Sequence, residues 1–396
     1  MTARHVLVFP SWYPADAADV RGVFFRDQAL ALRADGHKVG VVAVGMRSLR
    51  TLRQGSRSQS RTEDGGIPTY RDEVWAALPR VPHGNYWLWR RVARRLFSRY
   101  VRGQGWPDVI HAHASIYAGA VAAELGREYG IPVVLTEHSS GFARRIYRPW
   151  QWRLAAAAAE AAALRITVSP GLGELLGREL ATQQKDWIWV PNVVAERFMG
   201  RNQREREGRG SVRFLNLALM TPNKGQADLL TAFAQAFGGQ KGFELWLGGD
   251  GPIRSQLETR ARELGLDGQV RFLGRVEPDA VPALLGEVDV MVIASHYETF
   301  GVVAAEALMA GRPVVATRCG GPECIVGEDD GLLVEPRAPD QLAQALRRIS
   351  DRLDEYPANA LAQRARARFG GAAVAKELTA IYEDVIREHA SENGSR

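Results

Sequence analysis

The chain has 396 residues, 46% of them apolar and 24% charged, which is typical of a globular protein and long enough for two domains. No apolar run approaches the roughly 18 residues of a membrane-spanning helix, and the four-residue run near the N-terminus is too short for the core of a signal peptide. Residues 1–195 contain 26 Lys and Arg against 16 Asp and Glu, whereas the rest contains 25 against 29, so the first half suggests a partner with phosphates or an anionic surface.

Apolar, β-branched strands alternate with helical patterns along the first half, which predicts a parallel sheet with helices on both faces. The strands are expected at 5–9, 38–44, 108–111, 132–136, 165–168 and 187–190. The helices between them are expected at 23–33, 117–129 and 151–163.

A polar stretch without periodicity, residues 201–210, predicts a linker before a second alternating series. Its strands are expected at 212–218, 243–247, 270–273, 289–293 and 313–316, and helices at 339–353 and 374–389 end the chain. The pattern predicts an α/β protein of two doubly wound, Rossmann-like domains that face each other across a cleft. The expected domains are 1–200 and 201–370, with a terminal helix in 371–396 that packs back on the first domain. Ligands of such sheets bind at the carboxyl ends of the strands.

The segment 296–308 places one carboxylate before a predicted helix and another inside it. Glu298 follows the strand 289–293, and Gly301 precedes the helix that carries Glu306. Phosphate is the natural ligand of a helix start, because its first N–H groups lack partners and the helix dipole makes that end positive. Glu298 can bind hydroxyls attached to that phosphate, and Glu306, which leans toward the helix start, can bind a ribose. An ordinary helix with a capping and a surface glutamate is the alternative.

Two candidates in the first half also follow strands. Gly22 begins the helix 23–33, where it can cradle a phosphate or form a simple turn. His138 follows the strand 132–136 and can donate to a phosphate or polarise a hydroxyl, with a core histidine as the alternative. His111 and His113 alternate at another strand end, but a third metal ligand is missing from their neighbourhood.

The second half contains two more candidates at strand ends. Lys224 opens a helix after the strand 212–218, where its ammonium group suits a diphosphate, and a solvated surface lysine is the alternative. Gly249 begins a strand-to-helix turn, 249–252, that either is structural or lines the cleft.

Taken together, these segments resemble glycosyltransferase family 4, whose members are retaining enzymes with two Rossmann-like domains, the GT-B fold, and here of the bacterial polysaccharide-biosynthesis type. Glu298 and Glu306 match the family's pair of glutamates separated by seven residues. The resemblance covers nearly the whole chain, because further matches fall in the family's order. These matches are 108–113, Pro191-Asn192, Lys224-Gly225 and 249–252.

The resemblance implies a UDP- or GDP-sugar as donor substrate in the second domain and no cofactor. Glu306 would bind the ribose, and Glu298 the hydroxyls of the donor sugar. The segment Phe300, Gly301, Val302 and Val303, through its amides, would hold the diphosphate together with Lys224, and Gly249 would line the donor site. His138 and the Gly22 loop would close on the sugar from the first domain. The implied catalytic residues are Glu298, His138 and Lys224.

The chain departs from the family pattern at one position of the donor site. The family places an arginine five residues before this lysine, whereas Leu219 stands here. Either another group replaces the arginine, with Asn223 or Arg318 as candidates, or the donor binds more weakly.

The resemblance also implies a mechanism. Retention without an evident nucleophile indicates same-face attack, in which the departing phosphate oxygen takes the proton of the acceptor. Oriented N–H groups and Lys224 stabilise the leaving diphosphate without a metal. No Asp-x-Asp occurs in the sequence, which argues against the metal-dependent, single-domain type of enzyme.

An arginine-rich stretch in the first half bears on the acceptor. Helical spacing places Trp89, Ala93, Leu96, Phe97 and Tyr100 on one apolar face, which is typical of a helix on an anionic membrane surface. A domain helix with a solvated basic face is the alternative. The basic residues of this stretch are Arg90, Arg91, Arg94, Arg95, Arg99 and Arg102, and the loop 47–61 adds five arginines.

We therefore expect a cytoplasmic enzyme, peripheral on the inner face of the cell membrane, that extends a lipid-linked glycan for a surface polysaccharide. Cys319 and Cys324, in no metal or redox spacing, fit a reducing compartment. Nucleic acid is not an expected partner, because no binding motif accompanies the charge. The alternatives are an enzyme of the same fold with a soluble acceptor such as a sugar phosphate, and a non-catalytic nucleotide-sugar-binding subunit.

Overall fold

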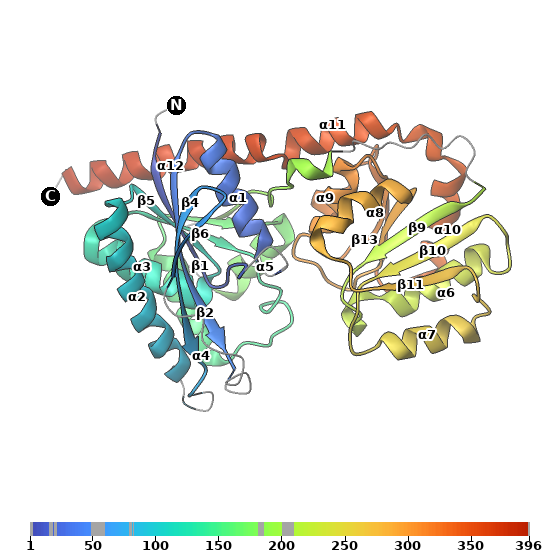
Figure 1. Ribbon diagram of the computed structural model, residues 1–396, viewed down its shortest axis with the longest axis horizontal. Helices are drawn as coiled ribbons and strands as arrows, with labels where there is room; N and C mark the ends of the chain where they lie inside the picture. Colours follow the sequence, from blue (N-terminus) through green and yellow to red (C-terminus); the bar gives the residue numbers. More distant parts are fainter. Residues whose placement is uncertain are drawn as a thin grey trace. The chain divides into compact units, whose positions relative to one another are not determined.

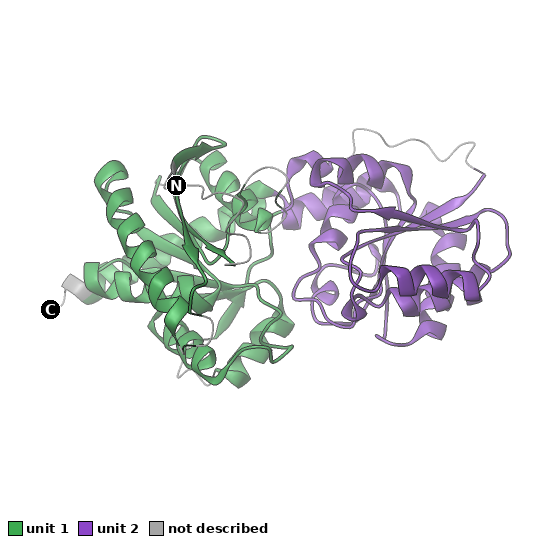
Figure 2. Ribbon diagram, turned by 60° about the horizontal axis from the view of Figure 1, so that its bottom comes forward, with its two compact units in different colours: residues 1–193, 371–396 green, residues 194–370 purple. Residues whose placement is uncertain are grey.

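The computed structural model describes residues 3–15, 19, 22–48, 60–78, 81, 83–180, 186–199 and 210–394. The chain divides into two compact units, which we call unit 1 (residues 1–193 and 371–396) and unit 2 (residues 194–370), as Figures 1 and 2 show. Unit 2 therefore begins seven residues before the expected boundary, and residues 201–209 of the expected linker lie outside the described residues. Both units are α/β domains with mainly parallel sheets, which confirms the predicted fold class.

Unit 1 contains an eight-stranded sheet in the order β3-β4-β2-β1-β5-β6-β7-β8. All neighbours pair in parallel except β3 and β4, which form an antiparallel hairpin at one edge. The strands are β1 (His5–Pro10), β2 (Lys38–Arg47), β3 (Ser60–Asp64), β4 (Ile67–Trp75), β5 (Val109–His113), β6 (Val133–Glu137), β7 (Leu164–Thr167) and β8 (Trp187–Trp189). Their central members are buried and apolar, as strands covered on both faces must be.

Helices cover both faces of this sheet (Figure 1). They are α1 (Val23–Ala34), α2 (Gly84–Gln104), the one-turn helix η2 (Ser115–Gly119), α3 (Ala120–Tyr129), α4 (Pro149–Ala161), α5 (Pro170–Glu179) and the terminal helix α12 (Gly371–Gly394). α12 packs beside α1, and its buried Leu378 and Tyr382 join the core formed by α1 and the central strands. Tyr382 also reaches the sheet, because its hydroxyl lies 2.6 Å from Nδ1 of His111.

The arginine-rich helix α2 is a component of the domain core. Its apolar face, which includes Trp89, Leu96 and Tyr100, is fully buried against the sheet, with Trp89 Nε1 donating to the carbonyl of Val44. This face cannot lie in a lipid interface at the same time, so the membrane-surface interpretation of this face is wrong. Several of its arginines pair with neighbouring carboxylates, in the pairs Arg90–Glu124, Arg94–Glu128 and Arg95–Asp72.

Unit 2 contains a six-stranded, wholly parallel sheet in the order β11-β10-β9-β12-β13-β14. The strands are β9 (Val212–Leu217), β10 (Phe243–Gly248), β11 (Val270–Gly274), β12 (Val290–Ile293), β13 (Val314–Thr317) and β14 (Gly331–Val334). Counted within the unit, this order is 3-2-1-4-5-6, the order of dinucleotide-binding folds. The order reverses between β9 and β12, which is where such sheets bind their ligands.

The helices of unit 2 are α6 (Gln226–Phe237), α7 (Arg254–Glu263), α8 (Val281–Glu287), α9 (Val302–Met309), α10 (Pro339–Asp351) and α11 (Ala358–Phe369). α6 and α10 pack together over one face of the sheet and bury Phe233 and Leu346. None of the helices in the described part of the chain combines the length and the apolar character needed to span a bilayer.

Candidate functional site

In unit 2 the predicted donor-site residues meet where the strand order reverses. Lys224 ends the loop that follows β9, and Glu298 lies in the loop that follows β12. Lys224 Nζ lies 2.5 Å from Glu298 Oε1, and Ser295 donates to the same oxygen at 2.7 Å. Both side chains of the ion pair are partly exposed, at 25% and 17%. The structure thus places a cation and a carboxylate side by side at the edge where this topology binds ligands.

Backbone contacts hold these two loops together. His296 N donates to the carbonyl of Asn223, and Asn223 Nδ2 donates to the carbonyl of Tyr297. Gly225 has a φ of 64°, and a Cβ added there would lie 1.9 Å from the carbonyl oxygen of Ala294. Only glycine allows this approach, so the sequence Lys224-Gly225 serves to bring the lysine against the β12 loop.

Helix α9 begins beside this pair, as the sequence predicts. Gly301 is its N-cap residue, with φ 84° and ψ 52°, so the first N–H groups, those of Val302 and Val303, have no partner within the helix. The Phe300 side chain is 2% exposed and packs edge-on against Phe369, so only its backbone can contribute to a ligand site. The amides and dipole of α9, with Lys224, form a surface suited to a diphosphate.

Glu306 and Gly249 complete the predicted set in different ways. Glu306 lies on α9, half-buried, between one and two turns from Gly301. Gly249 adopts a φ of 124°, and a Cβ there would lie 2.0 Å from the carbonyl oxygen of Ala218. Gly249 is therefore required for the close approach of the β9 and β10 loops, the structural alternative that the sequence left open.

The two candidates to replace the family arginine both make contacts of their own. Leu219 is 68% exposed at the end of β9, so its position is open to solvent. Asn223 is used to hold Tyr297, and Arg318 points to Glu335 at 3.8 Å. Neither candidate is placed as a second cation beside Lys224.

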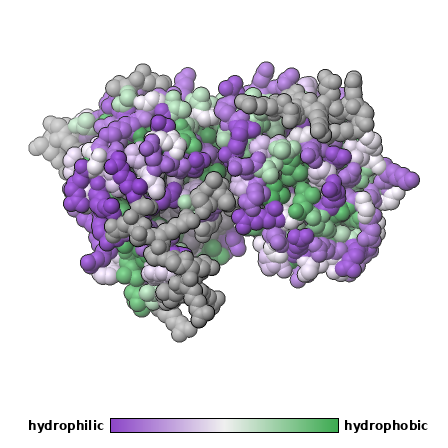
Figure 3. Space-filling model, in the orientation of Figure 1, coloured by the Kyte–Doolittle hydropathy of each residue, from purple (hydrophilic) through white to green (hydrophobic). Residues whose placement is uncertain are grey.

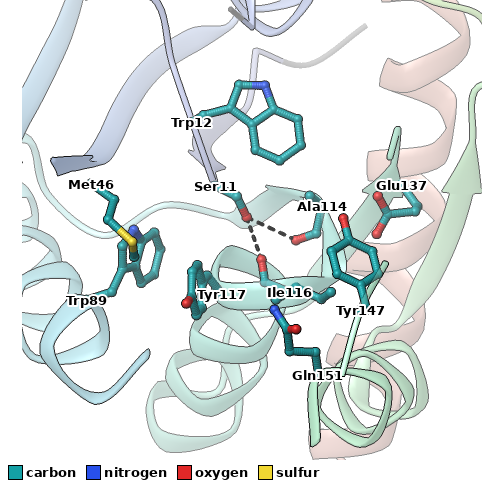
Figure 4. A pocket seen from close by; sticks show the side chains of 10 residues that line it. All are labelled: Ser11, Trp12, Met46, Trp89, Ala114, Ile116, Tyr117, Glu137, Tyr147 and Gln151. Atoms are coloured by element: carbon teal, nitrogen blue, oxygen red, sulfur yellow. Dashed lines mark hydrogen bonds between the residues drawn. The ribbon is translucent and has the colours of Figure 1, made fainter. Parts of the chain in front are cut away.

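Unit 1 has the same reversal of strand order, between β1 and β5, and a cavity of about 230 Å³ lies at that point (Figure 4). Its walls are mostly aromatic and apolar, and come from the ends of β1, β2 and β5 and from α2 and α4. The aromatic side chains are Trp12, Trp89, Tyr117 and Tyr147, and Met46 lies at one side. Its polar side chains are Ser11, Glu137 and Gln151.

One wall of the cavity is a strained turn after β5. Ala114 (φ 70°, ψ 129°) and Tyr117 (φ 70°, ψ −79°) both have positive φ, which non-glycine residues rarely adopt. Ser11 fixes the turn from β1, because its hydroxyl donates to the carbonyl of Ile116 and accepts from the amide of Ala118. Such strain persists only where surrounding contacts enforce it, and it concentrates at functional sites.

Glu137 fixes the same turn from β6. One carboxylate oxygen accepts from the amide and the hydroxyl of Ser115, and the other accepts from the amides of His138 and Ser139. Burial raises the pKa of Glu137, and these hydrogen bonds oppose that rise. The carboxylate thus uses all of its acceptor sites to join the ends of β5 and β6.

His138 lies behind this wall as part of a buried histidine cluster. Its ring packs against Phe24 and Phe25 of α1, and its Nε2 lies 3.1 Å from Nδ1 of His113. Burial, with a smaller contribution from His111, lowers the pKa of His138 to about 3, so the ring is neutral near pH 7. Nδ1 of His138 has no hydrogen-bond partner among the described residues. A neutral ring can polarise a hydroxyl through one N–H, but it cannot act as a cation for a phosphate.

Gly22 and His111 each have a role in the fold of unit 1. Gly22 caps α1 with a φ of 76°, and a Cβ there would lie 2.9 Å from the Phe25 ring and 3.0 Å from Trp12. His111 is fully buried with both ring nitrogens bonded, to the hydroxyls of Tyr382 and Thr136. No cluster of three metal-ligating side chains occurs among residues with a described position.

Sequence reasoning missed most of the cavity in unit 1. Tyr147 and Gln151 lie on a loop and a helix far from any motif, and no signal in the chain marks them. Trp12 lies in the loop that leads to Gly22, and Glu137 directly precedes His138. The sequence predicted a role for Gly22 and His138 but not for these two neighbours. The tyrosine at 117 was expected to begin a regular helix, whereas α3 begins three residues later, after the strained turn.

Two family models match the chain. A model described as Glycosyltransferase Family 4 matches residues 22–197, and one described as Glycosyl transferases group 1 matches residues 211–352. The two matches lie largely within unit 1 and unit 2, respectively.

Known proteins resemble the chain over much of its length. A 2-deoxystreptamine glucosyltransferase of Streptomyces kanamyceticus is 30% identical over 283 residues, which cover 65% of this chain and 71% of that protein. The putative teichuronic acid biosynthesis glycosyltransferase TuaC of Bacillus subtilis is 25% identical and covers 96% of this chain and 99% of its own length. The solved structure of Anabaena Alr3699/HepE in complex with UDP and glucose has a TM-score of 0.69 at 21% identity, and covers 96% of this chain and 100% of that one. The likeness in structure shows the GT-B fold.

Proposed function

The chain belongs to glycosyltransferase family 4, as its motifs predicted, and we propose that it transfers a sugar with retention from a UDP- or GDP-sugar to a hydroxyl of a glycan acceptor. The observation that carries this proposal is the Lys224–Glu298 pair beside the start of α9. A helix start with a lysine suits a diphosphate, and an adjacent carboxylate suits sugar hydroxyls. The HepE structure, which shares the fold, is a complex with UDP and glucose and supports this kind of donor.

In the proposed reaction, the amides from Gly301 to Val303 and the ammonium group of Lys224 bind the diphosphate, and Glu306 binds the ribose. The bond between the anomeric carbon and the phosphate oxygen breaks while the acceptor oxygen bonds to the same face of that carbon. The acceptor proton passes to the departing phosphate oxygen. Negative charge develops on this oxygen, and donors that are already oriented stabilise it without a metal.

Glu298 binds the hydroxyls of the donor sugar in this proposal, and its present contacts support the role. Lys224 and Ser295 fix one carboxylate oxygen, so the group is held in one orientation at the edge of the sheet. A fixed acceptor loses little freedom when the sugar binds.

The test is a thermal-shift screen of UDP-, GDP- and ADP-sugars, followed by a transfer assay with the wild type and Glu298→Gln. We expect one nucleotide-sugar to stabilise the protein, EDTA to leave transfer unchanged, and Glu298→Gln to cut turnover strongly. Near-wild-type transfer by Glu298→Gln would contradict the assignment of Glu298 to the catalytic site. Donor binding without transfer or hydrolysis would instead indicate a non-catalytic nucleotide-sugar-binding subunit.

We further propose that the acceptor is a lipid-linked glycan at the inner face of the membrane. The likeness to TuaC, a putative enzyme of teichuronic acid biosynthesis, over nearly the whole chain supports a surface polymer. The apolar face of α2 is buried, so in this proposal the lipid is contacted by exposed side chains near the start of the helix. These side chains are Leu78, Val81 and Trp87. Figure 3 shows an apolar area over that end of α2, at the lower left of the view.

Flotation with liposomes of anionic lipid tests this part of the proposal. Binding at low salt that is lost at high salt and weakened by Trp87→Ser would support it. No binding at low salt would favour a soluble acceptor, as the name of the 2-deoxystreptamine glucosyltransferase suggests for that relative.

A further inference from the structure

From the cavity in unit 1 we infer that the acceptor binds there through an uncharged sugar ring, stacked on aromatic side chains, and not through a phosphate or another ionised group. The inference rests on the proposed function, because it gives the chemistry of the acceptor of that reaction. It is carried by three features of the cavity: its aromatic walls, the lack of a free charge among the described residues that line it, and the fixed turn that presents Tyr117 (Figure 4).

The aromatic walls suit the apolar face of a pyranose. Trp12, Tyr117 and Tyr147 are each half-buried and line the same cavity from three different elements. The C–H groups on one face of a sugar ring are attracted to the negative face of an aromatic ring, and the hydroxyls at its edge need a few polar partners. The side-chain NH₂ group of Gln151, whose oxygen already accepts from the amide of Arg148, and the Tyr147 hydroxyl, which bonds Ser139 and can form one further hydrogen bond, are the polar groups for that edge. A volume of about 230 Å³ is at the small end for ligand pockets, which suits one ring.

The described residues that line the cavity have no free charge to offer to an ionised acceptor. No lysine or arginine occurs among the described residues that line it, and Glu137 is its one carboxylate. The four acceptor sites of that carboxylate are already used by Ser115, His138 and Ser139. A phosphate placed here would lose its hydration beside a carboxylate and gain no cation, which disfavours its binding.

The turn that carries Tyr117 is built to present this ring. Tyr117 stacks on Tyr86 at 5.6 Å and on Trp89 at 5.7 Å, with interplanar angles of 8° and 19°. Ser11 and Glu137 hold the backbone on either side of the residue in its strained form. A ring that is fixed before binding loses little freedom when a ligand stacks on it, which is an advantage for a weak contact with a neutral sugar.

The test measures binding of neutral and charged sugars to the full chain without a donor. The probes are the methyl α-pyranosides of glucose, galactose and mannose and the 6-phosphates of the same three sugars, at millimolar concentrations, observed by saturation-transfer NMR and competition. We expect at least one neutral glycoside to bind, and its 6-phosphate to bind about tenfold more weakly, which corresponds to about 1.4 kcal/mol.

Three variants locate the binding. Tyr117→Gly removes the ring and also relieves the backbone, since glycine adopts a positive φ freely, so the fold should survive and glycoside binding should be lost. Tyr129→Ala removes an exposed aromatic ring of α3 that does not line the cavity and should leave binding unchanged. Met46→Arg adds a cation at an exposed position of the cavity and should reduce the preference for the neutral sugar to near unity.

The inference is overturned if no neutral glycoside binds, if a 6-phosphate binds the wild type as tightly as its neutral partner, or if Tyr117→Gly binds like the wild type. Its failure is distinct from that of the proposed function, which is decided by nucleotide-sugar binding at Lys224 and Glu298 in unit 2. If the protein binds a glycoside only when Tyr117 is present but binds no nucleotide-sugar, the sugar site in the cavity is supported and the proposed transfer reaction is contradicted.

Discussion

The sheets of both units reverse their strand order at one point, and each has a candidate ligand site there, but the chemistry at that point differs. In unit 2 the ends of β9 and β12 present an ion pair beside a helix start, Lys224 with Glu298, both partly exposed. In unit 1 the ends of β1 and β5 present aromatic rings, and the end of β6 presents one carboxylate, Glu137, whose hydrogen bonds are all made within the protein. The topology of both sheets therefore marks the same place for a ligand, and under the two proposals above the loops determine whether that ligand is charged or neutral.

Lowering the pH should destabilise unit 1 more than unit 2, and this is the largest difference that we expect between the two units. His111 and His138 have a pKa of about 3 because they are buried, and burial also lowers the pKa of His113 well below its usual value. Below pH 6.5 the unfolded chain takes up these protons and the folded unit does not, so the free energy of unfolding falls as the pH falls. Each histidine should contribute a loss of about 2 kcal/mol between pH 6.5 and 5. The raised pKa of Glu137 acts in the opposite sense, since the folded form holds that proton more tightly.

Scanning calorimetry at about pH 7 and pH 5 measures this difference, because each unit has its own core. The transition of unit 1 should move to lower temperature by more than that of unit 2. A His296→Gln variant serves as a control in unit 2, where this ring is only half-buried against Asp228. Equal shifts of both transitions would show that the histidine cluster does not set the acid stability.

Two glycines at the donor site should differ sharply when replaced by alanine. In Gly225→Ala the new Cβ would lie 1.9 Å from the Ala294 carbonyl, in addition to backbone strain, so we expect a loss of about 4 kcal/mol in the stability of unit 2. In Gly301→Ala the nearest atom is 3.6 Å away, and backbone strain alone should cost about 1 kcal/mol. Urea unfolding of both variants measures the difference, and similar losses would contradict the packing argument.

Removing the cation of the ion pair should affect the reaction rather than the fold. Lys224→Met leaves Glu298 without its cationic partner and the departing diphosphate without the positive charge of the lysine, so kcat should fall by about 100-fold, or about 3 kcal/mol. Lys241→Met, at an exposed position of unit 2, is the matched control and should transfer sugar at the wild-type rate. If Lys224→Met changed KM alone, the lysine would hold the donor without stabilising its departure.

The residues predicted for the donor site could be picked out from the sequence because they lie within short segments whose strand–loop–helix pattern is regular. Gly301 is the N-cap residue of α9, and Lys224 directly precedes Gly225, the N-cap residue of α6, so the chemistry of both positions follows from the backbone itself. The cavity in unit 1 could not be predicted in the same way, since Trp12, Tyr117 and Gln151 come from separate elements that only the folded chain brings together. The strained backbone at Tyr117 leaves no pattern in the sequence, because a tyrosine there is equally compatible with an ordinary helix.

The fold shows the same contrast. Buried parallel strands such as β1 and β12 were predicted closely, because an apolar run between turns indicates them directly. The edge hairpin of β3 and β4 and the short strand β14 were missed, since edge strands are short or polar on one side. For α2 the periodicity was right but the partner of its apolar face was not, because a sheet and a lipid surface both require the same amphipathic pattern.

The smallest expected effect is a gain in donor affinity when the arginine of the family pattern is restored. Leu219 is 68% exposed at the end of β9, so Leu219→Arg should fold without cost and add a guanidinium group to the cation at Lys224. Donor binding should tighten by up to about tenfold, about 1.4 kcal/mol, and this gain should shrink as salt is raised. Leu219→Gln is the control, because it adds a polar side chain without charge. If the two variants bind the donor equally, the single cation already satisfies the diphosphate, and the departure from the family pattern at this position has no effect on donor affinity.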